Sequence, residues 1–549
     1  MFELIIFSIL AVTIITPCGY IFTKHNNNSI INLSNDLIYG LILISFITLL
    51  LNFFFPLNII VNSLILLLPL FIVFKNLKIY YSFNFLKFLV FNLIIIFLLI
   101  AKSNIYRPDA ILYHLPYTGI LNNEKIIFGL SNLHFRFAHI SIIQYFSAFF
   151  NNFIFGSKGI IFSIAIIASA VIINFLAHLI CYLKYKKFNF HFFYLFSILI
   201  FIAYKMNRYG EYGNDAPTHF LFFFLISEII LTFNSKKIYF NANNLILAVF
   251  IILNKITMAF AIFLPFIFLK KNELFKVLLI PKSYFAFIFL FLWILKNMVI
   301  SGCAIYPISK LCLQNLEWTN IDQTISVSQE NEAWTKAWPD FVNINNISQA
   351  EYSKKFNWVS TWNSTHLKKI NKILLPYFML LVFIYLFIYF KFKEKQIIQN
   401  DIHNNKYLIL IILMVIFSII WFLKVPVYRY GYSYFVSFLA LGFAYMCTFN
   451  NSIKKNAYRF FIFFLILLTT GFTLKNLLRI VKPENLNYIS FFPKIIYTNK
   501  SDINKIESNN FIYYESVKMC GYSYAPCTHY LDQKLKFKKY YNYKVILTY

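Results

Sequence analysis

The chain has 549 residues and is 60% hydrophobic, 21% aromatic and only 13% charged. Soluble globular domains carry about 25% charged residues, so this composition excludes an ordinary soluble protein. Lys and Arg outnumber Asp and Glu by 50 to 21, which gives a formal net charge of +29. The lysines fall in short loops between apolar runs, as in the positive-inside pattern of membrane proteins, so we expect no nucleic-acid partner.

Apolar runs long enough to cross a bilayer recur along the whole chain, since a spanning helix needs about 17–25 residues. Their continuity favours helices over the alternating strands of a β-barrel. The first run lacks a basic start and a cleavage site, so we expect it to be retained as a span. The sequence predicts an all-α, polytopic transmembrane bundle of about 12–13 spans surrounded by membrane lipids. The predicted spans are 4–22, 36–54, 57–74, 86–102, 158–182, 188–204, 216–233, 275–296, 371–391, 406–423, 431–449 and 457–476, with a further segment at 243–269.

The apolar segment 243–269 is interrupted by Asn254 and Lys255, and each half is too short to cross a bilayer alone. It could be two half-helices that enter the membrane and return, an arrangement tolerated where the halves line a cavity. The alternative is one kinked span whose Lys255 reaches the interface. The returning arrangement keeps all lysine-rich loops on one side, which we take as cytoplasmic.

The opposite, non-cytoplasmic face then carries 103–157, 205–215, 297–370 and 477–549. We divide the chain into N-terminal helices, a first large outer loop, a helical core, a long Trp-rich outer loop, C-terminal helices and a small outer tail. These six regions are 1–102, 103–157, 158–296, 297–370, 371–476 and 477–549. Within the first outer loop, 110–123 and 138–153 suit helices that lie along the membrane surface.

Asp109 stands just before 110–123, with Arg107 and His114 close to it in sequence. A carboxylate at a membrane edge is costly unless it meets water, a partner or a substrate. An ionised carboxylate within hydrogen-bond reach of a hydroxyl can take its proton. We therefore expect Asp109 and His114 to be catalytic, Asp109 as the base and His114 orienting the substrate, and Arg107 to bind substrate. The alternative is that Asp109 only caps the following helix.

A second polar cluster, with Arg208, Glu211 and Asp215, occupies the loop 205–215 on the same face. We expect these side chains to bind substrate. Hard divalent cations prefer carboxylate oxygens, so Asp109, Glu211 and Asp215 could share a Mg²⁺ or Mn²⁺ ion, although nothing in the spacing demands a metal. Asp215 also precedes an apolar run, where it could serve only as a helix cap.

A third cluster, with Arg429 and Tyr430, lies between two apolar runs on that face. A guanidinium is always charged and matches the geometry of a phosphate, so Arg429 is expected to clamp one. Lys255 at the interrupted segment is a second phosphate ligand in this hypothesis. The alternative for Arg429 is that its side chain only reaches the membrane interface.

The long outer loop 297–370 holds five of the seven tryptophans, which could stack on sugar rings or anchor the loop at the membrane interface. They are Trp318, Trp334, Trp338, Trp358 and Trp362. Four of the seven cysteines fall on the non-cytoplasmic face, where disulfides persist. We predict the pairs Cys520–Cys527 and Cys303–Cys312; the alternative is four free thiols.

Several short motifs resemble those of the GT-C class of polytopic glycosyltransferases, in particular a poorly characterised bacterial branch. Asp109 with Tyr113 and His114 is similar to a D-x-x-x-Y-H variant, and Pro426 with Arg429 and Tyr430 to a late P-x-x-R-Y element. The run from Lys296-Asn297 through Gly302 to Tyr306-Pro307 resembles an N-x-x-x-x-G-x-x-x-Y-P stretch, and Cys520 with Pro526-Cys527-Thr528 resembles a cysteine-bearing tail. Many relatives carry two adjacent acids at the first site, whereas here Pro108 precedes Asp109.

The resemblance implies an inverting glycosyltransferase of the bacterial inner membrane, with its active face extracytoplasmic. It would move a sugar from a polyprenyl-phosphate-linked donor to a glycan or lipid acceptor, with Asp109 as the base and Arg429 on the donor phosphate. Two other functions remain open. A lipid-linked oligosaccharide flippase or transporter would use the same charged cavity for passage. A polysaccharide polymerase or ligase would also have many spans and a large outer loop.

Overall fold

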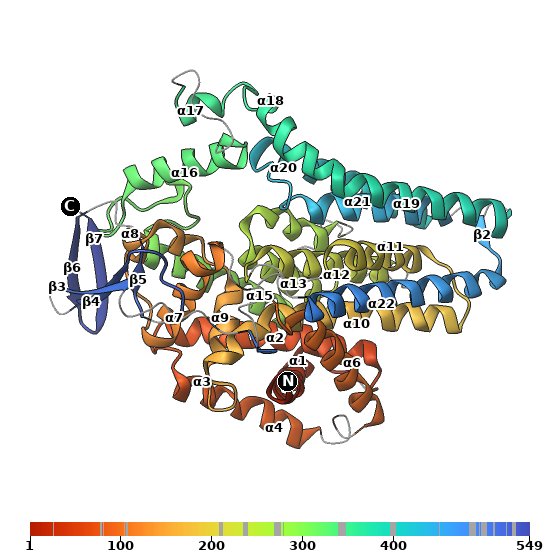
Figure 1. The fold of residues 1–549 in the computed structure, drawn as a ribbon, viewed down its shortest axis with the longest axis horizontal. Coiled ribbons are helices and arrows are strands. Elements are labelled where there is room, and N and C mark those ends of the chain that lie inside the picture. The colour runs from red at the N-terminus through yellow and green to blue at the C-terminus, as the bar shows by residue number, and fades with distance from the viewer. Residues whose placement is uncertain are drawn as a thin grey trace.

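The computed structural model describes residues 1–25, 27–76, 80, 82–103, 105, 108–207, 212–233, 240–267, 269, 276–277, 279–338, 347–395, 402–448, 451–482, 490–493, 495, 502–508, 511–522, 524–529 and 534–548. This part of the chain is mostly helical, and its long helices form a bundle with most of the strands gathered at one end (Figure 1). Nine helices within it are long and apolar enough to cross a membrane, so the prediction of a multi-pass helical membrane protein is confirmed. They are Phe2–Thr23, Ile30–Asn52, Phe83–Ile100, Gly156–Lys184, Asp215–Phe233, Pro281–Ser301, Val359–Phe392, Asn405–Lys424 and Lys455–Val481.

The remaining predicted spans also coincide with apolar helices, but these helices are shorter or broken. The predicted span 57–74 forms two pieces, α3 (Ile59–Ile65) and α4 (Leu67–Lys75), which meet at Leu66. Spans 188–204 and 431–449 correspond to α11 (Phe190–Lys205) and α21 (Tyr432–Thr448). Their apolar side chains are mostly buried against neighbouring helices.

The N-terminal helices α1 (Phe2–Thr23) and α2 (Ile30–Asn52) pack in close contact with each other. The contact is made possible by glycine on each helix. A Cβ built on Gly40 would lie 2.1 Å from the backbone oxygen of Ile15. A side chain at that position would therefore force the two backbones apart. α6 (Phe83–Ile100), α10 (Phe162–Lys184) and α12 (Asp215–Phe233) continue the bundle.

The interrupted segment breaks at Lys255, as its sequence predicts. α13 (Ala242–Asn254) ends there, Lys255 has extended backbone angles (φ −153°, ψ 110°), and a 3₁₀ helix, η4 (Ile256–Phe266), follows. α13 and η4 contact each other, and the returning arrangement stays a prediction. α15 (Pro281–Ser301) packs against α13 and completes this part of the core.

The first outer loop forms a series of short helices at the end of the bundle that also carries the strands (Figure 1). They are η1 (Ala110–His114), α7 (Leu115–Asn123), α8 (Leu130–Leu133), η2 (Phe135–His139), α9 (Ile142–Phe149) and η3 (Gly156–Ile161). Helices thus occur where the sequence predicts them, but α7 and α9 do not lie on an open surface. Nearly all of their residues are buried, because α7 and α9 pack against each other, α9 also packs against α2, and Tyr522 of the tail contacts α7.

The long outer loop begins as the end of α15 and contains η5 (Ser309–Leu311), α16 (Ile321–Thr335), α17 (Gln349–Tyr352), α18 (Val359–Trp362) and η7 (Asn363–Leu367). Its tryptophans do not form one exposed sugar-binding surface. Trp358 and Trp362 are 2% and 5% exposed, and both pack against Phe422. Trp334 is 41% exposed, which leaves it free for contact with lipid or substrate.

Of the C-terminal helices, α19 (Lys368–Phe392), α20 (Ile402–Lys424) and α21 lie together along one side of the bundle (Figure 1). α22 (Tyr458–Val481) lies apart from them and packs against α11, α6 and α10. At the end far from the outer loops, β1 (Lys393–Lys395) pairs antiparallel with β2 (Asn451–Ile453), and η8 (Lys455–Ala457) precedes α22. This short pairing ties the α19 end to the start of α22.

The outer tail folds as β-structure, so the all-α prediction holds for the membrane helices and not for the tail. β3 (Ile503–Ser508) and β4 (Phe511–Ser516) form an antiparallel hairpin, with β5 (Cys527–Thr528) parallel to β4. β6 (Leu535–Tyr540) and β7 (Tyr543–Thr548) form a second hairpin. Both predicted disulfides are present, Cys520–Cys527 in the tail and Cys303–Cys312 in the long loop.

Candidate functional site

Asp109 is the first acid of the outer loop, and its side chain does not cap the helix that follows. The backbone at Asp109 is already helical, and its carboxylate makes no capping hydrogen bond to the turn Ala110–His114. One oxygen, Oδ2, instead accepts a hydrogen bond from Arg429 Nη2 at 3.3 Å. The other, Oδ1, lies 4.0 Å from Arg136 Nη1. Asp109 therefore faces two arginines, with 30% of its side chain exposed.

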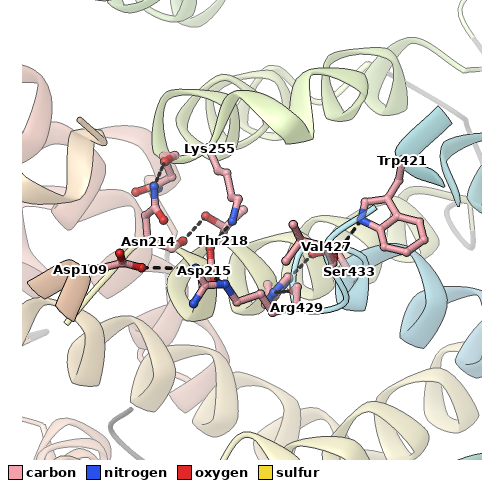
Figure 2. Close-up of polar contacts among 11 residues, drawn as sticks. Asp109, Asn214, Asp215, Thr218, Lys255, Trp421, Val427, Arg429 and Ser433 are labelled. Atoms are coloured by element: carbon pink, nitrogen blue, oxygen red, sulfur yellow. Dashed lines mark hydrogen bonds and ion pairs between the residues drawn. The ribbon is translucent and has the colours of Figure 1, made fainter. Parts of the chain in front are cut away.

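Arg429 joins Asp109 to a second acid, Asp215, the first residue of α12 (Figure 2). Arg429 Nε lies 3.2 Å from Asp215 Oδ2, while the other oxygen of Asp215 pairs with Lys255 Nζ. The two acids are more than one hundred residues apart in sequence, and a single guanidinium contacts both. Figure 2 shows the three side chains meeting, with Lys255 approaching from the break after α13.

Lys255 also lies over the aromatic ring of Tyr430, with Nζ 3.2 Å from the ring centroid. A cation placed on a tyrosine face is stabilised by the electrons of the ring. Burial, with the nearby charge of Asp215, raises the pKa of the Tyr430 hydroxyl to about 12. Tyr430 is therefore neutral at physiological pH and serves as a packing surface and a hydrogen-bonding group.

The loop that carries Arg429 is held by contacts to its backbone. His219 Nε2 donates to the carbonyl of Arg429 at 2.9 Å, and Ser433 Oγ donates to His219 Nδ1 at 2.6 Å. Trp421 Nε1 donates to the carbonyl of Val427 at 3.2 Å. A Cβ on Gly431 would lie 2.5 Å from the ring of Phe435, so this position admits only glycine without a shift. The loop is thus fixed, and a preorganised cation is more effective than a mobile one.

The five residues Asp109, Arg136, Asp215, Lys255 and Arg429, which we call the outer charge cluster, carry two negative and three positive formal charges. They come from the first outer loop, the start of α12, the interrupted segment and the loop before α21. The cluster therefore has one positive charge in excess, which favours an anionic ligand. Sequence analysis predicted four of the five; it missed Arg136, which lies in a mixed stretch of aromatic and histidine residues.

His114, the other predicted catalytic residue, lies behind Asp109 and does not enter the cluster. Its Nδ1 is 3.0 Å from Gln144 Nε2, and the residue is 2% exposed. Burial lowers the pKa of the His114 imidazole to about 4, so the ring is neutral at physiological pH. Its place beside Tyr113 makes it a support for the turn after Asp109. Arg107, Arg208 and Glu211 lie outside the described residues.

The described acids suit a divalent cation poorly. Both oxygens of Asp215 have cationic partners, and both oxygens of Asp109 face an arginine. A metal ion would have to displace these cations before it could bind. The described residues contain no group of three or more His, Cys, Asp or Glu side chains placed to hold a metal. We therefore derive no step through the Mg²⁺ or Mn²⁺ that the sequence left open.

The tail closes over the segment that carries Asp109. Gly521, within the loop closed by Cys520–Cys527, donates its backbone N–H to the carbonyl of Ile111 at 3.1 Å. Tyr522 Oη donates to Asn122 Oδ1 at 3.0 Å. The disulfide loop thus holds the turn after Asp109 from the outer side.

Comparison with known proteins gives one family match. Residues 1–436 match the family described as a domain of unknown function, DUF8201, a region that contains the whole outer charge cluster but not the tail. No curated protein and no solved structure matches the chain. Because the matched region makes up most of the 549 residues, the chain belongs to the DUF8201 family.

Proposed function

We propose that this protein is an integral-membrane glycosyltransferase of GT-C type. It would transfer a sugar from a polyprenyl-phosphate-linked donor to a glycan or lipid acceptor at the extracytoplasmic face of a bacterial cytoplasmic membrane. The observation that carries the proposal is the guanidinium of Arg429, which contacts both Asp109 and Asp215 at a fixed position among membrane helices. The motif resemblance indicates the class of donor, and the outer charge cluster supplies the groups for phosphate binding and for the base.

On the donor side, Arg429 and Lys255 bind the phosphate. An anionic phosphate can replace the Asp109 carboxylate at Arg429 and join Asp215 at Lys255, because guanidinium and ammonium groups bind either oxyanion. As the bond between the anomeric carbon and the phosphate oxygen breaks, its electron pair passes to the phosphate. Cations that are already in place stabilise that charge without reorganisation. Asp215 holds Lys255 and Arg429 in position for this step.

On the acceptor side, Asp109 acts as the base. When Arg429 turns to the phosphate, Oδ2 of Asp109 becomes available to accept a hydrogen bond from the acceptor hydroxyl. The hydroxyl oxygen attacks the anomeric carbon on the side opposite the leaving phosphate, and its proton passes to Asp109. Configuration at the anomeric carbon is therefore inverted. A positioned general base contributes about 10²–10⁴-fold to such a step.

The test is sugar transfer by Asp109→Asn in inverted and right-side-out membrane vesicles supplied with polyprenyl-phosphate-linked sugars. Asp322→Asn is the matched control, since Asp322 is an exposed acid of α16 on the same face. We expect transfer to fall by at least about a hundredfold in Asp109→Asn and to be unchanged in the control. Full transfer by Asp109→Asn would exclude its role as the base.

The interrupted segment favours one second candidate, a transporter or flippase for lipid-linked oligosaccharides. Broken helices that carry a charge near the centre of a bundle are common at transporter binding sites. Here the break places Lys255 in the outer charge cluster. The two functions separate in proteoliposomes with a labelled lipid-linked sugar. A transporter moves the intact lipid across the bilayer, whereas a transferase releases the polyprenyl phosphate and labels the acceptor.

A further inference from the structure

A second group of cationic and hydroxyl side chains, which begins with Arg136 beside Asp109, has no role in the transfer steps above. Lys296, near the outer end of α15, is 0% exposed, and its Nζ has no hydrogen-bond partner among the described residues. The ring of Trp293 lies close to this ammonium group, with its centroid 3.6 Å from Nζ. A fully buried ammonium without an anion is costly. A bound anionic ligand could provide the missing partner.

Two further side chains lie near this buried lysine: His139, which the charge of Lys296 reaches, and Tyr306, which packs against His139. Tyr306 is 5% exposed, and its hydroxyl also has no hydrogen-bond partner among the described residues. The Tyr306 ring packs against His139, with 5.1 Å between ring centroids. Asn331 Nδ2 lies 3.4 Å from His139 Nε2, and if the amide donates, Nδ1 of His139 carries the proton and is a donor. Burial and the nearby charges of Arg136 and Lys296 lower the pKa of His139 to about 4.

These groups are linked to Asp109 through the short helix η2. His139 and Arg136 both belong to η2, and η2 packs against α15, which carries Lys296. Arg136 faces Oδ1 of Asp109 with a partly exposed side chain, while Lys296 is fully buried. Both polar ends of the sequence run from Lys296 to Tyr306 are therefore near His139: Tyr306 packs against its ring, and the charge of Lys296 acts on it.

The two arginines beside Asp109 also distinguish the donor side of the reaction from the acceptor side. Arg429 contacts Oδ2 and Arg136 faces Oδ1. In an inverting transfer, the attacking hydroxyl and the leaving phosphate must lie on opposite sides of the anomeric carbon. If Arg429 holds the donor phosphate, the Arg136 side belongs to the acceptor. All donors on that side, an ammonium, a guanidinium, a phenol and an imidazole N–H, suit an oxyanion.

We propose that Arg136, His139, Lys296 and Tyr306 form a binding site for an oxyanion, a carboxylate or a phosphate ester, carried by the acceptor. The acceptor assignment rests on the proposed transferase function, whereas the anion site itself does not. The acceptor is therefore an acidic glycan or a phosphorylated lipid or glycan rather than a neutral sugar.

Thermal unfolding of the purified full-length protein in detergent tests the site without any transfer reaction. The probes are glucuronate and glucose 6-phosphate at matched ionic strength, with neutral glucose as the reference. We expect at least one charged sugar to raise the unfolding temperature, because a ligand that binds only the folded state stabilises it, and glucose to leave it unchanged. The probe that acts tells whether the site takes a carboxylate or a phosphate.

Two variants and two matched controls locate the effect. Lys296→Met should weaken binding of the active probe by roughly tenfold or more, since it removes a charged hydrogen-bond donor. Tyr306→Phe removes only a hydroxyl without a partner, so it should fold normally and still weaken the binding. Lys310→Met, at an exposed lysine of the same loop, and Tyr39→Phe, at a buried unpartnered hydroxyl of α2, should bind as the unaltered protein does.

Four outcomes are decisive. An equal response to glucose and to both charged sugars overturns the site, as does a response that persists in both Lys296→Met and Tyr306→Phe. A response lost in those variants and kept in Arg429→Gln supports a site separate from the donor phosphate. If that pattern is found but Asp109→Asn still transfers sugar at full rate, the anion site stands and its acceptor role fails with the transferase proposal.

Discussion

Replacement of Arg429 probes the contact on which the transferase proposal depends. Arg429→Gln removes the charge but keeps a similar length, while Arg429→Lys keeps the charge and loses the planar fork. In the structure, Nη2 lies 3.3 Å from Asp109 and Nε lies 3.2 Å from Asp215, so two different nitrogens serve two acids. A lysine ammonium is a single point charge and cannot reproduce both contacts in the same geometry.

The expected magnitudes follow from these contacts. A hydrogen bond to a charged group contributes about 1.5–3 kcal/mol when buried, and the Arg429 and Asp109 side chains are 24% and 30% exposed. We therefore place the loss of stability in Arg429→Gln near the lower end, about 1–2 kcal/mol. Loss of a preorganised group that stabilises developing charge costs about 10²–10³ in rate. We expect that loss in Arg429→Gln and a smaller one, about tenfold, in Arg429→Lys.

The assay measures the initial rate of sugar transfer in proteoliposomes together with the unfolding temperature of each variant. Arg429→Gln should lose transfer under conditions in which most of the protein stays folded. The order of rates should be the unaltered protein, then Arg429→Lys, then Arg429→Gln. Transfer by Arg429→Gln within about twofold of the unaltered rate would refute the reasoning. Loss of transfer that only follows loss of folding would also refute it.

Three further predictions concern the structure around the site. The His114 imidazole, whose pKa burial lowers to about 4, is neutral in the folded protein but takes up a proton near pH 6.5 in the unfolded chain. The contribution of His114 to the free energy of unfolding is therefore complete above about pH 6.5 and declines by at most about 3 kcal/mol as the pH falls toward 4. His114→Gln should flatten this pH dependence in thermal unfolding. Gly129→Ala should lower the free energy of unfolding by about 2 kcal/mol, because the φ of Gly129 is +67° and a Cβ would lie 2.1 Å from the Ile546 backbone oxygen. Limited proteolysis should then release the tail more readily, and an unchanged cleavage rate would contradict the packing described. Cys520→Ser, which leaves the Cys527 thiol free, should lower the rate of sugar transfer without loss of donor binding, because the disulfide loop holds the turn after Asp109. Unaltered transfer would show that the disulfide loop does not position that turn.

The membrane helices could be predicted because their signal is local. Each long apolar run is a helix, and the break at Lys255 follows from a charge inside such a run. The tail could not be predicted in this way, because strands such as Leu535–Tyr540 are short and rich in lysine, with one buried residue among six. Its pairing depends on contacts with the first outer loop, including the bond from Ile546 to Phe128.

The outer charge cluster was predictable where a charge interrupts an apolar context, as at Asp109, Asp215 and Arg429. Arg136 escaped notice because aromatic residues and histidines surround it, and nothing local indicates that it faces Asp109. The helix-cap interpretation of Asp109 was equally consistent with the sequence. Only the position of the carboxylate, which makes no capping bond and accepts from Arg429, separates the two.

A double-mutant cycle between Asp109 and Arg429 tests the central claim most directly. The measurement is the transfer rate of Asp109→Asn, Arg429→Gln and the combined variant in the same proteoliposomes. Residues that act as one catalytic unit give strongly non-additive losses, so the combined variant should lose little more than the slower single variant. Losses that multiply, or a combined variant that transfers at the unaltered rate, would contradict a single site built on this pair.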